Sequence, residues 1–262
     1  MASNFDLNSQ LELPESVKFQ SINSLNISTQ ERPAKLHEVS YEESTEDSKI
    51  DLSTTVSNLT KDLRGSFSNG MANVCESYVS TRLKAKFRRI AKSARDKEDS
   101  QSFLFSKFGQ LLKGFAFNSE HPYHKVFGAK YFIKNGSNRG HLILHFPAFI
   151  PQESLVTPKE ATHFKLYSQL VALSDFEFDQ ELGYRPINKK VHCKKSEFYS
   201  QIIPILKIPT QAITSQLSVN NGMGVPDSSA LLLTMGIHFY KYENCKYIPM
   251  SKESSLEIIK VF

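Results

Sequence analysis

The spacing of apolar residues changes once along this chain, and that change limits the fold more than any other feature. Between residues 63 and 94, apolar residues recur at steps of three or four, which places them on one face of an α-helix. They are Leu63, Phe67, Met71, Cys75, Val79, Leu83, Phe87, Ile90 and Ala94. From about residue 126 onward, apolar and polar residues alternate instead, as they do in half-buried β-strands. The sequence therefore predicts an α+β protein, with an N-terminal helical region followed by a predominantly antiparallel β-sandwich.

The helical region is expected over residues 59–115. Thr60 is a suitable N-cap, and Asp62 would lie in the first turn, where negative charge is favourable. Ser80 and Thr81 lie either inside one long helix or at a break that caps a second helix. The polar run at residues 96–102 ends the pattern.

The β-sandwich is expected over residues 116–262. A glycine-bearing turn at residues 135–138 joins two alternating segments and predicts a hairpin. Pro204 and Pro209 confine the segment Ser196–Ile208 to a sheet edge or a bulge. Further strands are predicted at residues 162–173, 174–179, 211–219, 231–242, 247–250 and 256–262. Closure into a barrel is the alternative to a sandwich.

The charge is distributed unevenly, although the whole chain carries only +5. Residues 1–60 contain four Lys/Arg and ten Asp/Glu, a net charge of −6, which leaves 28 and 17 and a net charge of +11 for residues 61–262. Residues 1–58 are rich in Ser, Asn and Glu and are expected to form an acidic arm, extended or disordered when alone. Such an arm could bind the basic body of its own chain or of a neighbouring copy.

Half of the sixteen residues from Arg82 to Lys97 are basic, and this segment is the candidate anion- or partner-binding site. Its candidate residues are Arg82, Lys84, Lys86, Arg88, Arg89, Lys92 and Arg95. Three interpretations of these residues are considered. The most favoured is that they form the solvated face of a helix that packs on the sheet; the second is a contact with an acidic protein surface, and the third is a contact with nucleic acid. The apolar face of the same helix makes packing its first role.

We expect no enzyme, no cofactor and no metal site. The pairs His121/His124 and His141/His145 have no third ligand nearby in the sequence, or lie too far apart along a strand to share one ion. Asp175, Glu177, Asp179 and Glu181 alternate with other residues, which predicts a solvent-facing acidic row on a strand. The chain also has no G-x-S-x-G nucleophile motif and no phosphate-binding loop.

The three cysteines are an odd number without metal-like spacing, which favours reduced thiols. The first residues have neither the basic nor the apolar region of a secretory signal, and no apolar run is long enough to span a bilayer. A cytoplasmic location without membrane contact is the expectation.

Four segments resemble a group of uncharacterised hypothetical proteins common in Bacteroidota. They are LLKGFAFN (111–118), HFPAFIPQ (145–152), EATHFKLYS (160–168) and MGIHFYKYENCKYIPM (235–250). The resemblance covers about residues 60–262 and implies the same helical and β-rich halves and a bacterial setting. It departs at Glu160 and Cys245, where glycine is usual, and in the acidic arm. It implies no site residues, because the group brings no established function.

These observations together predict a non-catalytic structural or protein-interaction module. We expect it to self-assemble, or to bind a protein partner, through the acidic arm and the sheet edge near Ser196–Ile208. The alternative is a nucleic-acid-associated protein that binds phosphates through residues 82–97. No small-molecule substrate is indicated.

Overall fold

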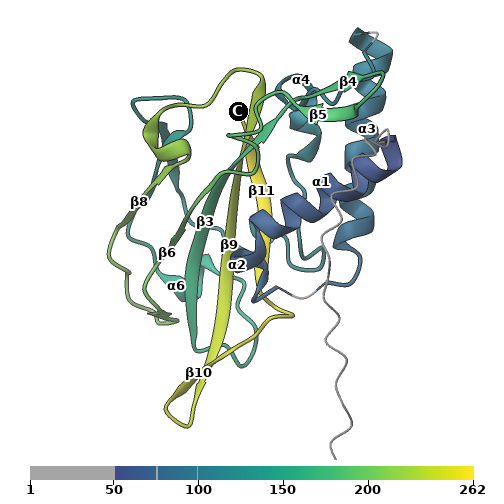
Figure 1. The fold of residues 1–262 in the computed structure, drawn as a ribbon. Helices are drawn as coiled ribbons and strands as arrows, with labels where there is room; N and C mark the ends of the chain where they lie inside the picture. Colours follow the sequence, from purple (N-terminus) through teal and green to yellow (C-terminus); the bar gives the residue numbers. More distant parts are fainter. Residues whose placement is uncertain (1–50, 75, 99) are drawn as a thin grey trace, which may run out of the picture. The chain divides into compact units, whose positions relative to one another are not determined.

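The computed structural model describes residues 51–262 except residues 75 and 99 (Figure 1). Its helices are α1 (Leu52–Ser66), α2 (Ser68–Met71), α3 (Val79–Glu98), α4 (Phe105–Phe108), α5 (Tyr123–Val126) and α6 (Pro151–Ser154), with 3₁₀ turns η1 (Gly109–Leu112) and η2 (Asn220–Gly222). Most of the predicted acidic arm lies outside the described residues, as does Cys75 of the predicted helix face.

The first helix begins earlier than the sequence predicted. Asp51, and not Thr60, is the N-cap of α1, and its side chain accepts a hydrogen bond of 2.6 Å from the Thr54 N–H. This bond holds the pKa of the Asp51 carboxyl below its usual value. Thr60 lies in the helix interior, where its hydroxyl donates to the carbonyl of Val56. Residues 52–58 are therefore helical and do not belong to an extended arm.

The helical structure is interrupted between α2 and α3, and α3 begins at Val79, just before the Ser80–Thr81 position at which the sequence allowed a break. Beyond the break, the predicted apolar face of α3 is confirmed, because Leu83, Phe87 and Ile90 are fully buried. They pack with Leu59 and Leu63 of α1 in one core cluster.

The strands are β1 (Phe132–Asn135), β2 (His141–Phe146), β3 (His163–Ser174), β4 (Phe176–Asp179), β5 (Gly183–Pro186), β6 (Lys195–Tyr199), β7 (Ile203–Pro204), β8 (Ile213–Ser218), β9 (Ser229–Glu243), β10 (Lys246–Pro249) and β11 (Ser255–Val261). The long strands β3 and β9 form the centre of a six-stranded antiparallel sheet. On its outer edges, β10 and β11 pair with β9, whereas β6 and β7 pair with β3. The edge position predicted for Ser196–Ile208 is confirmed.

A second sheet, with the order β1-β2-β8, packs against one face of the six-stranded sheet. Its first two strands form the predicted hairpin, in which Phe132 lies opposite His145. Leu144 and Leu217 from this sheet share a core with Leu166 and Leu233 of β3 and β9. The strands β4 and β5 form a separate hairpin.

Helices α1 to α4 cover the opposite face of the six-stranded sheet (Figure 1). Residues 229–239 of β9 are consequently buried without interruption, since both faces of the strand are covered. Alternate residues serve the two cores: Leu231 and Leu233 face the second sheet, whereas Ala230 and Leu232 face the helices. The predicted α+β class is confirmed.

Part of the helix-facing side of this sheet is polar. The Tyr167 hydroxyl donates to Gln169 (2.6 Å), and the Gln169 amide donates to the Ser66 carbonyl (2.6 Å). The ring of His238, which is 0% exposed, stacks on Tyr167 with centroids 5.5 Å apart. Gly70 of α2 lies directly over the Tyr167 ring. Small and polar residues thus fit α2 closely against the sheet.

Replacement of Gly70 by alanine is expected to lower the free energy of unfolding by about 1–3 kcal/mol. A Cβ atom at this position would lie 2.4 Å from Cε1 of Tyr167, a ring that its hydrogen bond to Gln169 holds in place. Gly65→Ala is the control, because nothing lies within 4 Å of a Cβ there, and it should stabilise α1 by up to about 1 kcal/mol. Urea denaturation of both variants measures the difference, and equal midpoints would contradict this account.

Acid is expected to destabilise the protein through His238. Burial, the largest cause, lowers the pKa of His238 to about 4 from its usual 6.5, and Lys165 adds to the effect. Below pH 6.5 the unfolded chain therefore binds a proton that the folded chain refuses, and stability falls until about pH 4, by about 3 kcal/mol. His238→Gln should flatten this part of the profile, whereas His121→Gln, outside the network, should leave it unchanged. Thermal denaturation between pH 4 and 7 measures this, and parallel profiles would refute the assignment.

Candidate interaction surfaces

The seven predicted anion-binding residues of α3 separate into two groups. Arg82 is used inside the protein: its guanidinium contacts Glu76 Oε1 at 2.6 Å, donates to the Ala116 carbonyl at 2.5 Å and lies 4.8 Å from the ring centre of Phe115. Lys86 donates from Nζ to the carbonyl of Leu111 at 2.8 Å. Burial, followed by repulsion from Arg89 and Arg82, lowers the pKa of Lys86. Both residues therefore fasten α3 to residues 111–116.

The second group forms what we call the cationic ridge, which consists of Arg88, Arg89, Lys92 and Arg95. All four side chains are exposed, and none forms an ion pair or hydrogen bond with another residue in the described part of the chain. Lys84 is half-buried and lies outside this group. The ridge is thus the portion of the predicted site that is free to meet an anion.

The two groups should respond differently to loss of charge. Arg82→Gln is expected to lower the free energy of unfolding by about 1–3 kcal/mol, because it removes the side-chain donor to the Ala116 carbonyl and leaves Glu76 with only its hydrogen bonds from Ser119. Arg88→Gln on the same helix should change it by less than about 0.5 kcal/mol. Urea denaturation at neutral pH compares them, and a comparable loss in both would show that the ridge also supports the fold.

A second surface lies where the edges of the two sheets meet. The edge strands β6 and β8 approach at one end, where the Ser218 N–H donates to Ser196 Oγ at 3.0 Å. In the described residues no ladder of backbone hydrogen bonds joins them. At the other end they diverge around the proline-containing segment 201–209. The sandwich is therefore open along this side.

The free backbone groups of β8 follow from the alternation of an antiparallel ladder. Val219 donates its N–H to Gly140, beside β2, whereas the neighbouring Ser218 N–H points to β6. By the same alternation, the N–H and C=O groups of Thr214 and Gln216 face away from β2. On β6, the Ser200 N–H bonds to Leu166 of β3, so Glu197 and Tyr199 direct their backbone groups away from that strand.

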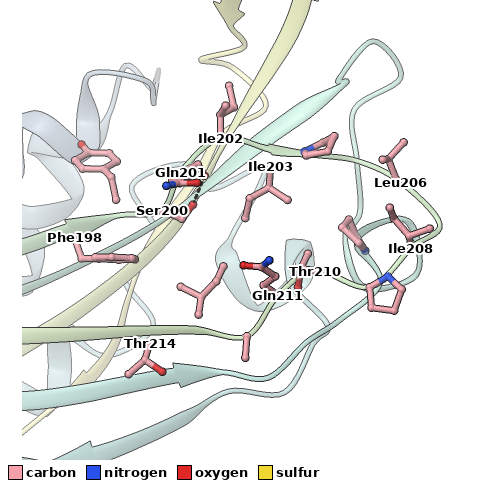
Figure 2. Close-up of a pocket in the computed structure, with 16 residues that line it drawn as sticks. Phe198, Ser200, Gln201, Ile202, Ile203, Leu206, Ile208, Thr210, Gln211 and Thr214 are labelled. Carbon is pink, nitrogen blue, oxygen red and sulfur yellow. Dashed lines mark hydrogen bonds between the residues drawn. The ribbon is translucent and has the colours of Figure 1, made fainter. Parts of the chain in front are cut away.

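The opening between these edges is a groove of about 580 Å³, hereafter the edge groove. Figure 2 shows Phe198 and Thr214 on its two walls, with Ile203 and Gln211 between them and Leu206 and Ile208 at one end. Ile208 is 62% exposed and Leu206 is 43% exposed. None of the residues that line it carries a charge. The edge groove thus offers apolar contacts beside unpaired strand edges.

The histidine pairs and the acidic residues that the sequence analysis considered as possible sites form no site among the described residues. His124 pairs with Glu257 at 2.9 Å. Asp175 does not belong to a solvent-facing row, because it is buried and accepts hydrogen bonds from the Ser106 N–H and hydroxyl, whereas Glu177, Asp179 and Glu181 are exposed as expected. Among residues 51–262, leaving out 75 and 99, no group of three His, Cys, Asp or Glu side chains is placed to hold a metal ion.

The two cysteines that the structure describes, Cys193 and Cys245, are free thiols. Burial raises the pKa of the Cys193 thiol to about 11, which keeps it protonated and unreactive at neutral pH. Cys245 is exposed in the turn between β9 and β10, where it has a positive φ of 58°, a conformation that glycine adopts most readily.

The sequence matches no protein-family model and no curated protein. No helix in the described ranges combines the length and the apolar character that crossing a membrane requires. Sequence reasoning located one wall of the edge groove from Pro204 and Pro209, but it missed the wall formed by residues 210–214. The sequence pattern that corresponds to this wall is the alternation of exposed polar residues in a short strand. Most edge strands show the same alternation, so it does not point to a groove.

Proposed function

We propose that this protein is a non-catalytic interaction module that binds an extended protein segment in the edge groove. The observation that supports this proposal is the pair of unpaired strand edges, β6 and β8, on either side of an uncharged, partly apolar groove. Extended segments bind such edges by forming the next strand of the sheet.

The backbone groups supply the affinity in this mode of binding. Thr214 and Gln216 each present an N–H and a C=O group outward from β8, at the spacing of alternate residues of a strand. A segment laid beside β8 would satisfy these groups, and one laid beside β6 would satisfy those of Glu197 and Tyr199. Unpaired edges of this kind are sites of association unless they are covered.

The side chains select the partner. Ile203, Leu206 and Ile208 provide apolar contacts, and the absence of charge from the groove lining disfavours a strongly charged segment at its centre. A suitable segment has apolar residues at alternate positions, because these point to the same side of a strand. The N-terminal arm contains such a segment in LELPESVKFQ (11–20), in which Val17 and Phe19 are two residues apart.

We therefore propose the arm of a second copy as the partner, which makes the function self-assembly. The arm is long enough, since residues 20–50 alone can span about 100 Å when extended. Assembly through exchanged arms leaves the two sheets of each copy unchanged, because it adds a strand and removes none.

Thr214→Pro is expected to abolish association of the full chain, since proline removes the outward N–H while the ladder to β2 remains intact. Thr214→Ala is the matched control, because it loses the same side chain and keeps the N–H. Light scattering over a range of concentrations should show assemblies for the natural chain and for Thr214→Ala, and a monomer for Thr214→Pro at an equal melting temperature.

A second pair of variants tests the groove side chains. Ile208→Asp places a charge in the groove and should weaken association at least tenfold, whereas Val156→Asp, at an equally exposed apolar residue outside the groove, should not. A natural chain that is monomeric at every concentration, or a Thr214→Pro variant that associates normally, would overturn the proposal.

A further inference from the structure

The described helices cover only part of the length of the six-stranded sheet. Helix α2 ends at Met71, and the Asn73 amide that follows lies 3.5 Å from the hydroxyl oxygen of Tyr240. Past Tyr240, strands β9 and β10 continue as a hairpin, which Figure 1 shows extending beyond α2. Tyr242 and Tyr247 of this hairpin are 46% and 45% exposed. This end of the sheet therefore presents aromatic rings to solvent.

These rings belong to a row that we call the aromatic strip, which consists of Tyr199, His163, Tyr240, Tyr242 and Tyr247. His163 is directly opposite Tyr240, and Tyr247 is directly opposite Tyr242, so each pair lies on one face of the sheet. The ring centres of Tyr242 and Tyr247 are 4.8 Å apart, and the ring of His163 lies 5.0 Å from that of Tyr247. Tyr199, which is 36% exposed, stands at the other end of the strip on β6.

The aromatic strip continues the face on which the helices pack. Ala230 and Leu232 of β9 belong to the helix-facing core, and side chains at every second residue of a strand point to the same side. Tyr240 and Tyr242 therefore also point to the helix-facing side, at the end of the strand that α2 does not reach. The strip is accordingly an extension of a packing surface that the described helices leave uncovered.

The polar groups beside these rings are mainly hydrogen-bond donors. The hydroxyls of Tyr199, Tyr242 and Tyr247 bind no other residue in the described part of the chain, so each can donate outward. The ammonium group of Lys165, on β3, lies 5.7 Å from the ring centre of Tyr240 and forms no ion pair among the described residues. The strip thus combines aromatic rings with free donors and little charge.

We infer that the aromatic strip binds a proline-rich segment of a partner protein in the polyproline II conformation. The chemistry of the two surfaces carries this inference. Proline has no N–H group, so such a segment offers carbonyl acceptors without internal partners and few backbone donors. Its rigid apolar rings pack against aromatic faces, and aromatic-lined surfaces are a general means by which proteins bind this conformation.

The length of the strip suits a short segment of this kind. Tyr199 is opposite Tyr167, which in turn is opposite Gly236 of β9, and Gly236 is six residues from Tyr242. Six residues of a strand span about 20 Å. A polyproline II helix rises about 3.1 Å per residue, so about six residues in that conformation match the strip.

The charges around the strip disfavour single-stranded nucleic acid as the occupant. Lys241 of β9 is held by Glu160 at 3.0 Å and by Glu243 at 3.3 Å. Lys165 then contributes a single unpaired charge beside the strip, whereas a nucleic-acid strand requires a basic groove that follows its phosphates.

A saccharide is also a poorer match than a proline-rich segment. Its hydroxyls both donate and accept, so it calls for free acceptors as well as donors. The carboxylate of Glu197, beside Tyr199 on β6, is already bound by the Asn69 amide at 2.6 Å and by the Tyr167 hydroxyl at 3.3 Å. The donors of the strip therefore lack a matching set of free carboxylates among the described residues.

This inference concerns the face of the sheet and not its edge, so it goes beyond the proposed self-assembly and stands or fails separately from it. Tyr199 also lines the edge groove. The variants below are therefore made at Tyr242 and Tyr247, at the end of the strip that does not line the groove.

A fluorescein-labelled decaproline peptide tests the strip by fluorescence anisotropy with the full chain. We expect saturable binding that Tyr242→Ala/Tyr247→Ala weakens at least tenfold. Tyr78→Ala/Phe132→Ala is the matched control, because these aromatic residues are 71% and 51% exposed outside the strip, and it should bind as the natural chain does. Equal losses in the two double variants, or no binding by the natural chain at millimolar concentration, would overturn the inference.

A measurement on the natural chain does not depend on how the variants fold. With ¹³C-labelled tyrosine rings, decaproline should shift the nuclear magnetic resonance signals of Tyr242 and Tyr247 and leave that of Tyr78 unchanged. Shifts confined to tyrosines outside the strip would refute the assignment.

The same peptide distinguishes the strip from the edge groove. Decaproline has no N–H group within its chain of prolines, so it cannot form the next strand of a sheet. Ile208→Asp, which should weaken self-assembly, should therefore bind decaproline as tightly as the natural chain. A tenfold loss in Ile208→Asp would place the peptide in the edge groove and contradict the inference.

Two further labelled probes compare the other occupants, a thymidine oligonucleotide of ten nucleotides and cellohexaose. We expect the natural chain to bind both at least tenfold more weakly than decaproline. Tighter binding of either probe than of decaproline, lost in Tyr242→Ala/Tyr247→Ala, would assign the strip to that class of ligand and overturn the inference.

Discussion

The pairing of β3 with β9 is the interaction on which the rest of this structure depends. Twelve residue pairs, from His163–Tyr240 to Ser174–Ser229, join two strands that are covered on both faces. The other elements are arranged around this ladder. Helices α1 to α4 pack on one of its faces, the second sheet packs on the other, and shorter strands pair with its two edges. Burial on both faces makes polar residues in these strands costly: Gln169 is hydrogen-bonded to the Ser66 carbonyl and His238 stacks on Tyr167, whereas the hydroxyls of Ser168, Ser229 and Thr234 have no hydrogen-bond partner in the described residues.

The same arrangement leaves two surfaces unsatisfied. The six-stranded sheet and the second sheet end side by side at β6 and β8. Among the described residues, these two edge strands are joined by the hydrogen bond between Ser218 and Ser196 and not by a backbone ladder, so backbone groups and apolar side chains remain open in the edge groove. On the helical side, α3 buries its apolar face and presents its charges outward. Both candidate surfaces are therefore consequences of how the layers close.

Periodicity predicted the elements well and their surroundings less well. The alternation around Leu231 and the four-residue steps through Leu83 and Phe87 identified a strand and a helix correctly, because each element must bury one face. The start of α1 was misplaced, since Thr60 and Asp51 are both residue types that cap helices and only the fold decides between them. Asp175 was expected in solvent, but Ser106, which is distant in the sequence, supplies the hydrogen bonds that allow its burial.

The sequence by itself determined the α+β class, the order of helical and β regions, the edge position of the proline-containing strand and the location of the basic helix. These depend on local spacing and on the backbone chemistry of proline. Only the tertiary structure decided which basic residues are free, because Arg82 and Lys86 bind carbonyl groups that lie 25 or more residues away. It alone also placed β8 opposite β6. A groove between two strands depends on contacts between distant segments, and no local pattern records those contacts.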